Sequence, residues 1–239
     1  MIDRKGEYFY SGARGHRAGE TTMGRSAGSN GARTAEAIRR VGLRLIYRHG
    51  YEAMTLRDLA AKVGIQAASL YNHIKTKQGL LFDLIRVHLE TLLAATDAAL
   101  DSAPPGALDR LRAFIAHHIT YHLERKQEVF VANFELRALK PVNYATIVTM
   151  RRAYEGKLIT ILDVGVASGE FEIRDTRITA YAILAMLTGV CTWYKPDGRL
   201  TKEEVVALHT EMVLQGCVGL PRGTPERGKL RLVSQRDAI

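Results

Sequence analysis

The segment from Thr55 to Lys75 constrains the fold of this chain more than any other part of the sequence. In its first half, Leu59 and Val63 lie at helical spacing, Gly64 breaks the pattern, and a second short helical run follows. That second run carries small and polar residues where a buried helix would carry apolar ones. Two short helices joined by a tight turn, the second of them polar, are typical of a helix-turn-helix. The second helix of such a motif lies in the major groove of DNA.

Positive charge is concentrated in the part of the chain that contains this segment. Residues 1–80 hold 14 Lys and Arg against 6 Asp and Glu, so they carry +8 of the chain's net charge of +9. An evenly basic protein would not show so uneven a distribution, whereas docking of a polyanion on the N-terminal third favours it. The charge pattern therefore indicates double-stranded DNA as a partner.

Length and composition argue against several other classes of protein. The 239 residues are enough for one large or two modest domains with a real core. No apolar run approaches the roughly 18 residues of a membrane span, so we expect no membrane partner. Residues 1–31 lack the apolar segment of a secretory signal. Because the chain has two cysteines, we expect buried thiols at Cys191 and Cys217, rather than a bridge between them, in a reducing cytoplasm.

The chain is predicted to be all-α, because helical patterns recur along it and no segment is typical of a strand. The expected helices cover residues 33–49, 56–63, 67–74, 77–101, 108–123, 128–139, 142–168, 178–194 and 202–217. We expect a disordered basic arm over residues 1–31, a three-helix helix-turn-helix domain over 32–78, a second helical domain over 79–219 and a flexible tail over 220–239.

Local signals mark several ends of these helices. Thr55 is a good N-cap for the helix that follows it, and Gly50 is suited to end the first helix. Thr201 and Glu204 have the spacing of a capping box that opens the last helix. The segment 178–194 is small and apolar on every side, which predicts a helix buried all round.

Residues 33–85 resemble the DNA-binding domain of the TetR family of bacterial transcriptional regulators. The resemblance rests on Leu45 with Gly50-Tyr51, Thr55 with Arg57-Asp58-Leu59-Ala60, Val63-Gly64-Ile65, Ser69-Leu70-Tyr71-Asn72-His73-Ile74 and Lys75-Thr76-Lys77. It implies a protein of the bacterial nucleoid, with a DNA-binding domain followed by a helical bundle for ligand binding and dimerisation. The function implied is a homodimeric repressor that a small-molecule effector releases from a palindromic operator.

Nine residues of the motif are candidates for DNA contacts. Thr55 offers a hydroxyl and nearby backbone N–H groups to a phosphate, and Arg57 is placed to reach a base edge or a phosphate. The segment Ala67-Ala68-Ser69 faces the groove floor, where two alanines favour methyl contacts and DNA shape over hydrogen bonds. Asn72 is suited to a base or a phosphate. The residues that match phosphate contacts of the family are Tyr71, His73 and Lys77.

Each of these candidates also has a plainer interpretation. Tyr71 would otherwise pack the helix pair together, and His73 would be an ordinary surface histidine. Arg57 would form an exposed ion pair with Asp58 or Glu52, an interaction that contributes little to stability. The full motif favours the DNA interpretation.

Three segments of the second domain, 135–139, 169–171 and 193–200, look like the TetR branch that senses acyl-CoA thioesters of fatty-acid or sterol-ring catabolism. A ligand site between helices is usually apolar with a few polar groups. The candidates for it are Phe114, His118, Tyr121, Phe130, Phe134, Arg137, Tyr154 and Trp193, with His117, Asn133, Arg151 and Arg152 beside them. Aromatic residues at helical spacing are also common in an ordinary core, and the arginines also fit a solvated face.

No enzyme or cofactor signature accompanies these residues. His118 and His122 have the i, i+4 spacing that can hold one metal ion, but no Glu or Cys completes a site, so we expect no metal. The pattern Gly-x-Ser-x-Gly occurs once, from Gly24 to Gly28, but it lies in the arm expected to be disordered, with no strand before it to form a nucleophile elbow. The glycine-rich cofactor fingerprints are absent from the sequence. We therefore expect no catalytic residues and no cofactor.

The last two helices are expected to pair with their copies in a homodimer. Small residues on the first of them would permit close approach, namely Ala180, Ala182, Ala185 and Gly189. The helix 77–101 bridges the two domains, so it is the expected lever between effector and DNA. The rival interpretations are an architectural DNA binder with a filled second domain, a helical enzyme or interaction module, and an activator.

Overall fold

The computed structural model describes residues 27–219, and describes side chains from residue 31 onward. The basic arm expected over 1–31 lies mostly outside this range, and the tail expected over 220–239 lies wholly outside it. Within the described range the chain is helical and contains no strand, which confirms the predicted fold class. The first helix, α1 (Ala27–His49), begins earlier than the periodicity predicted.

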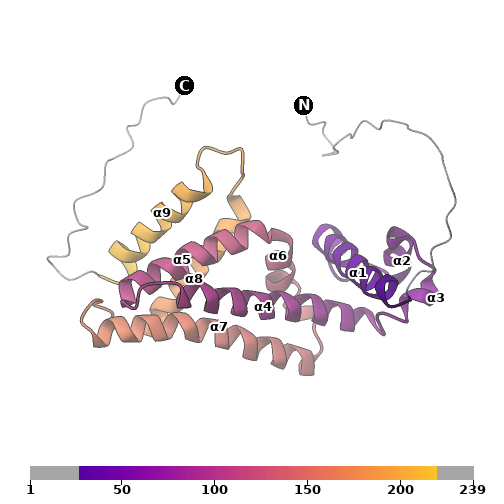
Figure 1. The fold of residues 1–239 in the computed structure, drawn as a ribbon, viewed down its shortest axis with the longest axis horizontal. Helices are drawn as coiled ribbons and strands as arrows, with labels where there is room; N and C mark the ends of the chain where they lie inside the picture. Colours follow the sequence, from indigo (N-terminus) through magenta and orange to yellow (C-terminus); the bar gives the residue numbers. More distant parts are fainter. Residues whose placement is uncertain (1–26, 220–239) are drawn as a thin grey trace.

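Three helices form the N-terminal unit, at the right of Figure 1. They are α1, α2 (Leu56–Val63) and α3 (Ala67–Leu70). Ile38, Ile46, Leu59 and Leu70 are fully buried where these helices meet. Gly64 has φ of +81°, a left-handed conformation that favours glycine, and it provides the turn between α2 and α3.

The N-cap prediction at Thr55 is confirmed, since its hydroxyl accepts a hydrogen bond of 3.1 Å from the backbone N–H of Asp58. The second helix of the motif is shorter than the predicted 67–74. After Leu70 the chain forms a turn, in which the Leu70 carbonyl accepts from the N–H groups of both His73 and Ile74, at 2.9 and 3.0 Å. Leu70 and Ile74 are buried as expected.

Helix α4 (Lys77–Asp101) runs from the N-terminal unit along the length of the second domain (Figure 1). Its bounds agree with the prediction. The first turn begins at Lys77 because the Thr76 hydroxyl caps it by accepting from the N–H of Gly79 at 2.9 Å. One continuous helix therefore connects the two parts of the molecule.

The second domain surrounds α5 (Ala107–Glu124), which packs against α4, α7, α8 and α9. Its other elements are α6 (Lys126–Phe134), the short 3₁₀ turn η1 (Leu136–Ala138), α7 (Pro141–Ala167), α8 (Thr176–Trp193), α9 (Lys202–Met212) and a π-helical turn η2 (Val213–Cys217). The predicted 128–139 helix is thus divided at Glu135. The capping box of Thr201 and Glu204 is present as predicted.

The link between α7 and α8 is held by two close contacts. A methyl group on Gly165 would overlap the ring of Phe171, so the ring packs directly on the backbone of α7. The Glu170 carboxylate accepts hydrogen bonds from the backbone N–H groups of Ala107 and Leu108, at 3.3 and 3.0 Å, and so caps α5. These contacts hold the link that leads into α8 against α7 and against the start of α5.

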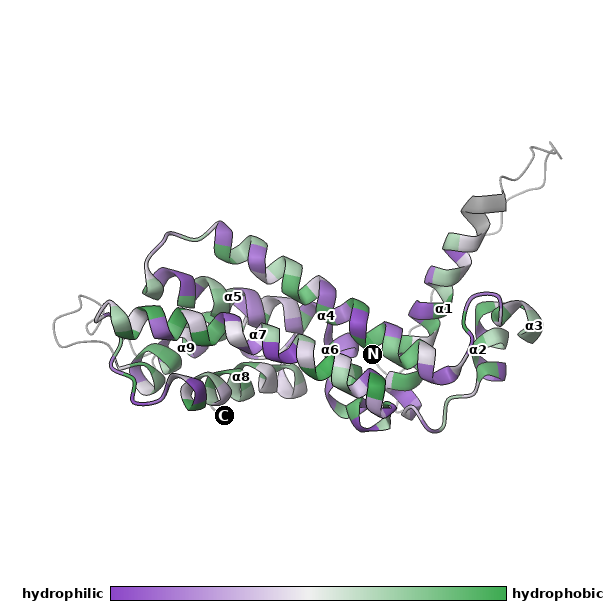
Figure 2. Cartoon of the chain, turned by 90° about the horizontal axis from the view of Figure 1, so that it is seen from below, coloured by the Kyte–Doolittle hydropathy of each residue, from purple (hydrophilic) through white to green (hydrophobic). Residues whose placement is uncertain are grey.

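The prediction that α8 is buried all round is wrong. Ala180 and Ile183 are fully buried, but Ile178 is 63 % exposed and Ala182 and Ala185 are exposed. Helix α8 packs mainly on α5 and α7 and also meets α6 and η2, whereas Ile178 and Ala182 remain exposed on another side of the helix. Figure 2 colours much of α8 as hydrophobic.

Two further expectations concern cysteines and membranes. Cys191 and Cys217 are free thiols, as predicted, although Cys217 is only half-buried. None of the helices in residues 27–219 combines the length and the apolar character needed to cross a membrane.

Candidate DNA-binding face and effector cavity

The DNA candidates lie at one end of the molecule, at the start of α2, on α3, on the turn after it and at the start of α4 (Figure 1). Eight of the nine are exposed, namely Thr55, Arg57, Ala67, Ala68, Ser69, Tyr71, Asn72 and His73. The Tyr71 side chain is 55 % exposed, which counts against a role in packing the helix pair. The arrangement leaves a surface of small side chains, bordered by polar ones, free to contact the floor of a groove.

Two of the candidates are engaged within the protein. The Thr55 hydroxyl donates to a carboxylate oxygen of Asp58 at 2.6 Å. The Lys77 ammonium donates to the carbonyl of Glu52 at 3.0 Å and lies 4.3 Å from the ring centre of Tyr51. An ammonium has three N–H donors, so Lys77 retains two for a phosphate while it holds the turn before α2.

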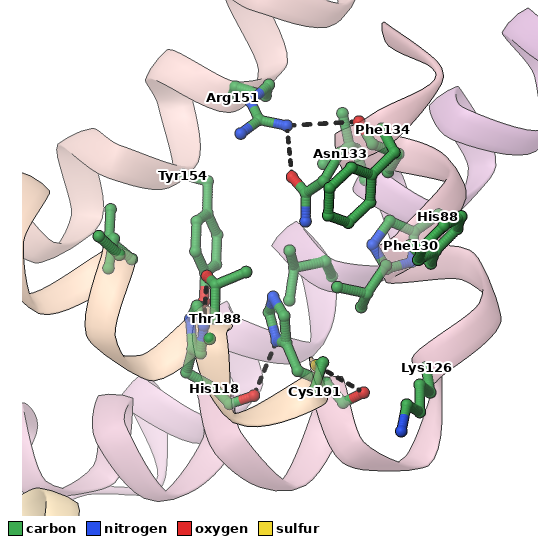
Figure 3. Close-up of a pocket in the computed structure, with 18 of the residues that line it drawn as sticks. His88, His118, Lys126, Phe130, Asn133, Phe134, Arg151, Tyr154, Thr188 and Cys191 are labelled. Atoms are coloured by element: carbon green, nitrogen blue, oxygen red, sulfur yellow. Dashed lines mark hydrogen bonds between the residues drawn. The ribbon is translucent and has the colours of Figure 1, made fainter. Parts of the chain in front are cut away.

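A cavity of about 700 Å³ lies in the second domain, within the usual size range of small-molecule sites. Helices α4, α5, α6, α7 and α8 all contribute to its wall. The wall is mainly apolar, and its polar members are His88, His118, His122, Lys126, Asn133, Arg151, Glu155, Thr188 and Thr192. Figure 3 shows several of them pointing toward a common space.

Half of the expected effector residues line this cavity, namely His118, Phe130, Phe134 and Tyr154. The other half lie elsewhere. Phe114 is fully buried and its ring centre lies 5.5 Å from that of Tyr154. The Tyr121 hydroxyl donates to the carbonyl of His88 at 3.3 Å.

The remaining two expected effector residues lie at the surface. Arg137 is exposed on η1, where its side chain does not reach the cavity wall. Trp193 is 51 % exposed at the end of α8, and its ring stacks on His209 of α9 with centres 6.0 Å apart. Asn133 and Arg151 do line the cavity, whereas His117 and Arg152 do not.

The buried histidines of the cavity wall are uncharged. His118 lies within hydrogen-bond distance of the Tyr154 hydroxyl through Nδ1, at 2.8 Å, and of Thr188 Oγ1 through Nε2, at 3.1 Å (Figure 3). Burial lowers the pKa of His118 well below its usual value, and lowers the pKa of His122 to about 3. Both rings are therefore neutral at pH 7.

The His118 and His122 rings form a stacked pair, with centres 3.7 Å apart. Nδ1 of His122 donates to the backbone carbonyl of His118 at 2.7 Å. Because a carbonyl only accepts, Nδ1 carries the proton and Nε2 of the neutral ring is an acceptor. Across residues 27–219, no three His, Cys, Asp or Glu side chains are grouped to hold a metal ion.

His88 is a cavity residue that we did not predict. It is 6 % exposed, and its Nδ1 has no hydrogen-bond partner among the described residues. Burial lowers the pKa of His88 to about 4, so the ring is neutral. Its position was visible in the sequence as a single polar residue on the apolar face of α4, between Ile85 and Leu92.

Two cations complete the cavity wall. Arg151 donates to Asn133 Oδ1 at 2.9 Å and to the carbonyl of Ala132 at 3.4 Å (Figure 3). Arg151 and Lys126 are partly exposed, whereas the histidines are buried. The cavity thus combines neutral, buried histidines with partly exposed charged groups, namely the cations Lys126 and Arg151 and the carboxylate of Glu155.

Two family models match the chain. The model described as bacterial regulatory proteins of the tetR family matches residues 38–84. The model described as a tetracyclin repressor-like C-terminal domain matches residues 104–217. The first match covers the DNA-binding face, and the second covers the cavity residues that come from α5 to α8.

Similar proteins include the HTH-type transcriptional repressor KstR2 of Mycolicibacterium smegmatis. It is 30 % identical over 169 residues, which are 70 % of this chain and 82 % of KstR2. A tetR-family regulatory protein from Rhodococcus RHA1 superposes with a TM-score of 0.73 at 28 % identity, over 78 % of this chain and 97 % of that one. AibR, solved in complex with isovaleryl coenzyme A and operator DNA, superposes with a TM-score of 0.70 at 27 % identity, over 75 % and 97 % of the two chains.

Proposed function

The chain belongs to the TetR family of bacterial transcriptional regulators, and we propose that it is a homodimeric repressor that an acyl-CoA thioester releases from a palindromic operator. The DNA-binding domain in this proposal spans residues 32–78, and the effector and dimerisation domain spans residues 79–219. The protein acts at the nucleoid in the cytoplasm, and we assign it no catalytic residue and no cofactor. The observation that carries the effector part of the proposal is the cavity of about 700 Å³.

The exposed surface of α2 and α3 supports the DNA-binding part of the proposal. Ala67, Ala68 and Ser69 present small side chains to the groove floor, and Tyr71 and His73 flank them toward the phosphates. The described part of α1 adds basic side chains to the same domain, because Arg39, Arg40, Arg44 and Arg48 are all exposed. This charge favours association with the DNA backbone.

An apolar surface on α8 and α9 supports the homodimer. Ile178 and Trp193 of α8 are exposed by 63 % and 51 %, and Leu208 and Met212 of α9 by 40 % and 50 %. The stacking of Trp193 on His209 joins the two helix surfaces at one end. A second copy of the chain would bury this surface in a self-complementary interface.

The small residues of α8 divide between the two sides of the helix. Ala182 is exposed and fits a close approach of a partner helix, whereas Ala185 and Gly189 lie at the edge of that surface because they also line the cavity. Ala180 is fully buried within its own chain and contributes nothing to that surface. A two-fold pairing through α8 and α9 would place the two α3 helices to meet half-sites about 34–36 Å apart.

The chemistry of the cavity wall supports a thioester effector. Its apolar surface and neutral histidines suit an acyl group with few polar atoms, because a buried charge would be left without a partner there. Lys126 and Arg151, which are partly exposed, are suited to the anionic phosphates of coenzyme A. The relative AibR was solved with an acyl-CoA bound.

Helix α4 provides a direct connection between the effector and the DNA. Its middle contributes His88, Leu89 and Leu92 to the cavity, and its N-terminus at Lys77 follows the DNA-binding segment. A ligand that prefers one arrangement of this helix weakens operator binding by its differential affinity for the two arrangements.

The test is a titration of acyl-CoA thioesters of increasing chain length and ring content against an operator fragment selected by the protein from random DNA. Fluorescence anisotropy of the labelled fragment reports release. We expect at least one thioester to weaken operator binding by about 5–150-fold, the usual range of allosteric coupling. If the protein stays bound to the fragment with every thioester, the effector class is refuted. The same titration still measures DNA binding itself.

The open cavity favours this function over an architectural DNA binder, which would have a filled second domain. A thermal-shift experiment separates the two. The proposal predicts that the effective thioester raises the melting temperature, whereas an architectural protein would show no ligand-dependent change.

A further inference from the structure

The cavity in the second domain is not enclosed by that domain alone. Tyr47, on the last turns of α1, is one of its lining residues. Tyr47 belongs to α1, which supplies buried residues to the core of the DNA-binding domain, and it lies eight residues before Thr55, the N-cap of α2. A ligand in the cavity is therefore in reach of the DNA-binding domain itself.

Tyr47 contacts the cavity wall through Phe130 of α6. The two rings meet edge to face, with centres 5.0 Å apart and an interplanar angle of 82°. Phe130 in turn packs on Phe134, with centres 4.6 Å apart, and both phenylalanines line the cavity. One end of the cavity is thus an aromatic wall made of one residue from α1 and two from α6, an arrangement with favourable ring geometry.

Polar contacts fasten the same part of the second domain to the DNA-binding domain. The backbone N–H of Tyr51 donates to the Glu135 carboxylate, at the end of α6, over 3.1 Å. Gln78, in the first turn of α4, donates to the carbonyl of Ala138 at 2.5 Å and accepts from the N–H of Lys140 at 3.1 Å. Both contacts join the segment from α6 to α7 to residues that flank the helix-turn-helix.

We propose that Tyr47 is shared by the effector site and the DNA-binding domain, and that its contact with Phe130 holds the arrangement that binds the operator. An effector that occupies the end of the cavity next to Phe130 separates the two rings and shifts α6, with Glu135, relative to α1. This connection runs through α6 and α1, in addition to the one through α4. The inference rests on the proposed function for its effector, but its structural part is testable in the ligand-free protein.

The ligand-free test is a double-mutant cycle on operator affinity. Tyr47→Ala and Phe130→Ala each remove one side of the ring contact, and each is expected to weaken operator binding about 3–10-fold. For Phe130→Ala this effect would come from a residue outside the DNA-binding domain. The double variant is expected to bind the operator about as tightly as the single variant with the lower affinity, because both changes remove the same contact. Tyr144→Ala, which removes an exposed tyrosine of α7 outside the cavity wall, is the matched control and should bind as the wild type does.

Loss of folding is separated from loss of coupling by a milder variant. Phe130→Leu keeps an apolar side chain in place and should weaken operator binding in the same direction, but by less. Thermal melting of each variant reports whether the helices remain folded. Wild-type operator affinity in folded Phe130→Ala or Phe130→Leu would overturn the proposal, and so would additive effects in the double variant.

The second arm uses isovaleryl coenzyme A and palmitoyl coenzyme A as probes. If either releases the wild type from the operator, Tyr47→Ala should still bind that probe within a few-fold but lose most of the release. A Tyr47→Ala variant that is released as fully as the wild type would overturn the proposal. If neither probe acts on the wild type, the thioester assignment loses support, and the ligand-free cycle still decides whether Tyr47 and Phe130 couple the domains.

Discussion

At the scale of single residues, the histidines around the cavity are the least expected feature of the protein. His88, His118 and His122 are buried, and their pKa values lie far enough below the usual value to keep all three neutral. A sequence pattern identifies His118 as a candidate, but it cannot show that Thr188 and Tyr154 satisfy its two nitrogens. Such partners are brought together only by the packing of α5, α7 and α8.

The neutral state of His88 predicts a loss of stability in acid. The folded protein keeps the pKa of His88 at about 4, whereas the unfolded chain binds a proton near pH 6.5. Between these values the unfolded state holds more protons, so stability falls as pH decreases from about 6.5 to about 4, by up to about 3 kcal/mol for this residue.

Urea unfolding at a series of pH values measures this effect. His88→Leu should remove the contribution of this residue and make the decline with pH shallower, with little change at pH 7.5. An equally steep decline in His88→Leu would show that other groups cause the acid sensitivity.

At the scale of helices, local signals predicted the capped ends correctly, although the start of α1 and the division of the predicted 128–139 helix were missed. The cap at Thr55, the capping box of Thr201 and Glu204 and the bounds of α4 all depend on residues within one turn of each other. The length of α3 and the exposed side of α8 were mispredicted, because both depend on what lies beside the helix. Ala182 is of a residue type common in cores, but it is exposed because no other element of the described chain covers it.

Helix α7 offers a matched pair of glycine substitutions. Gly165→Ala would drive a methyl group into the Phe171 ring, so we expect a loss of about 2 kcal/mol or more in the free energy of unfolding. Gly156 lies in the same helix with no atom within 4 Å of a built methyl group, so Gly156→Ala should be neutral or stabilise by up to about 1 kcal/mol. Thermal or urea unfolding of the two variants measures the difference. Equal effects at both sites would contradict the close packing of Phe171 on α7.

At the scale of the whole molecule, the sequence predicted an all-helical fold with an N-terminal helix-turn-helix, whereas the DNA contacts it indicates stay predictions. It did not predict that Tyr47 enters the effector cavity, nor that Arg137 and Trp193 lie outside it. A helical pattern shows which side of a helix is apolar, but not which other helix will cover it. The cavity wall draws on α1 and on five helices of the second domain, and their relative placement is a property of the complete fold.

The unpartnered surface of α8 and α9 predicts the oligomeric state. Leu208→Glu with Met212→Glu places two charges on that surface and should convert a dimer into a monomer, with loss of tight operator binding. Sedimentation velocity measures the state. Val142→Glu, at a residue that is 73 % exposed on the first turn of α7, is the control and should leave the dimer intact. A dimer that survives the double substitution would place the interface elsewhere.

Calorimetry measures directly whether effector binding in the cavity is coupled to operator binding at α3 in one molecule. The effective thioester is titrated into the protein alone and into the protein bound to its operator. Thermodynamic linkage requires that the operator weaken thioester binding by the same factor by which the thioester weakens operator binding. We expect a factor of at least about 5 in both directions. Equal thioester affinity for the free and the operator-bound protein would contradict this coupling.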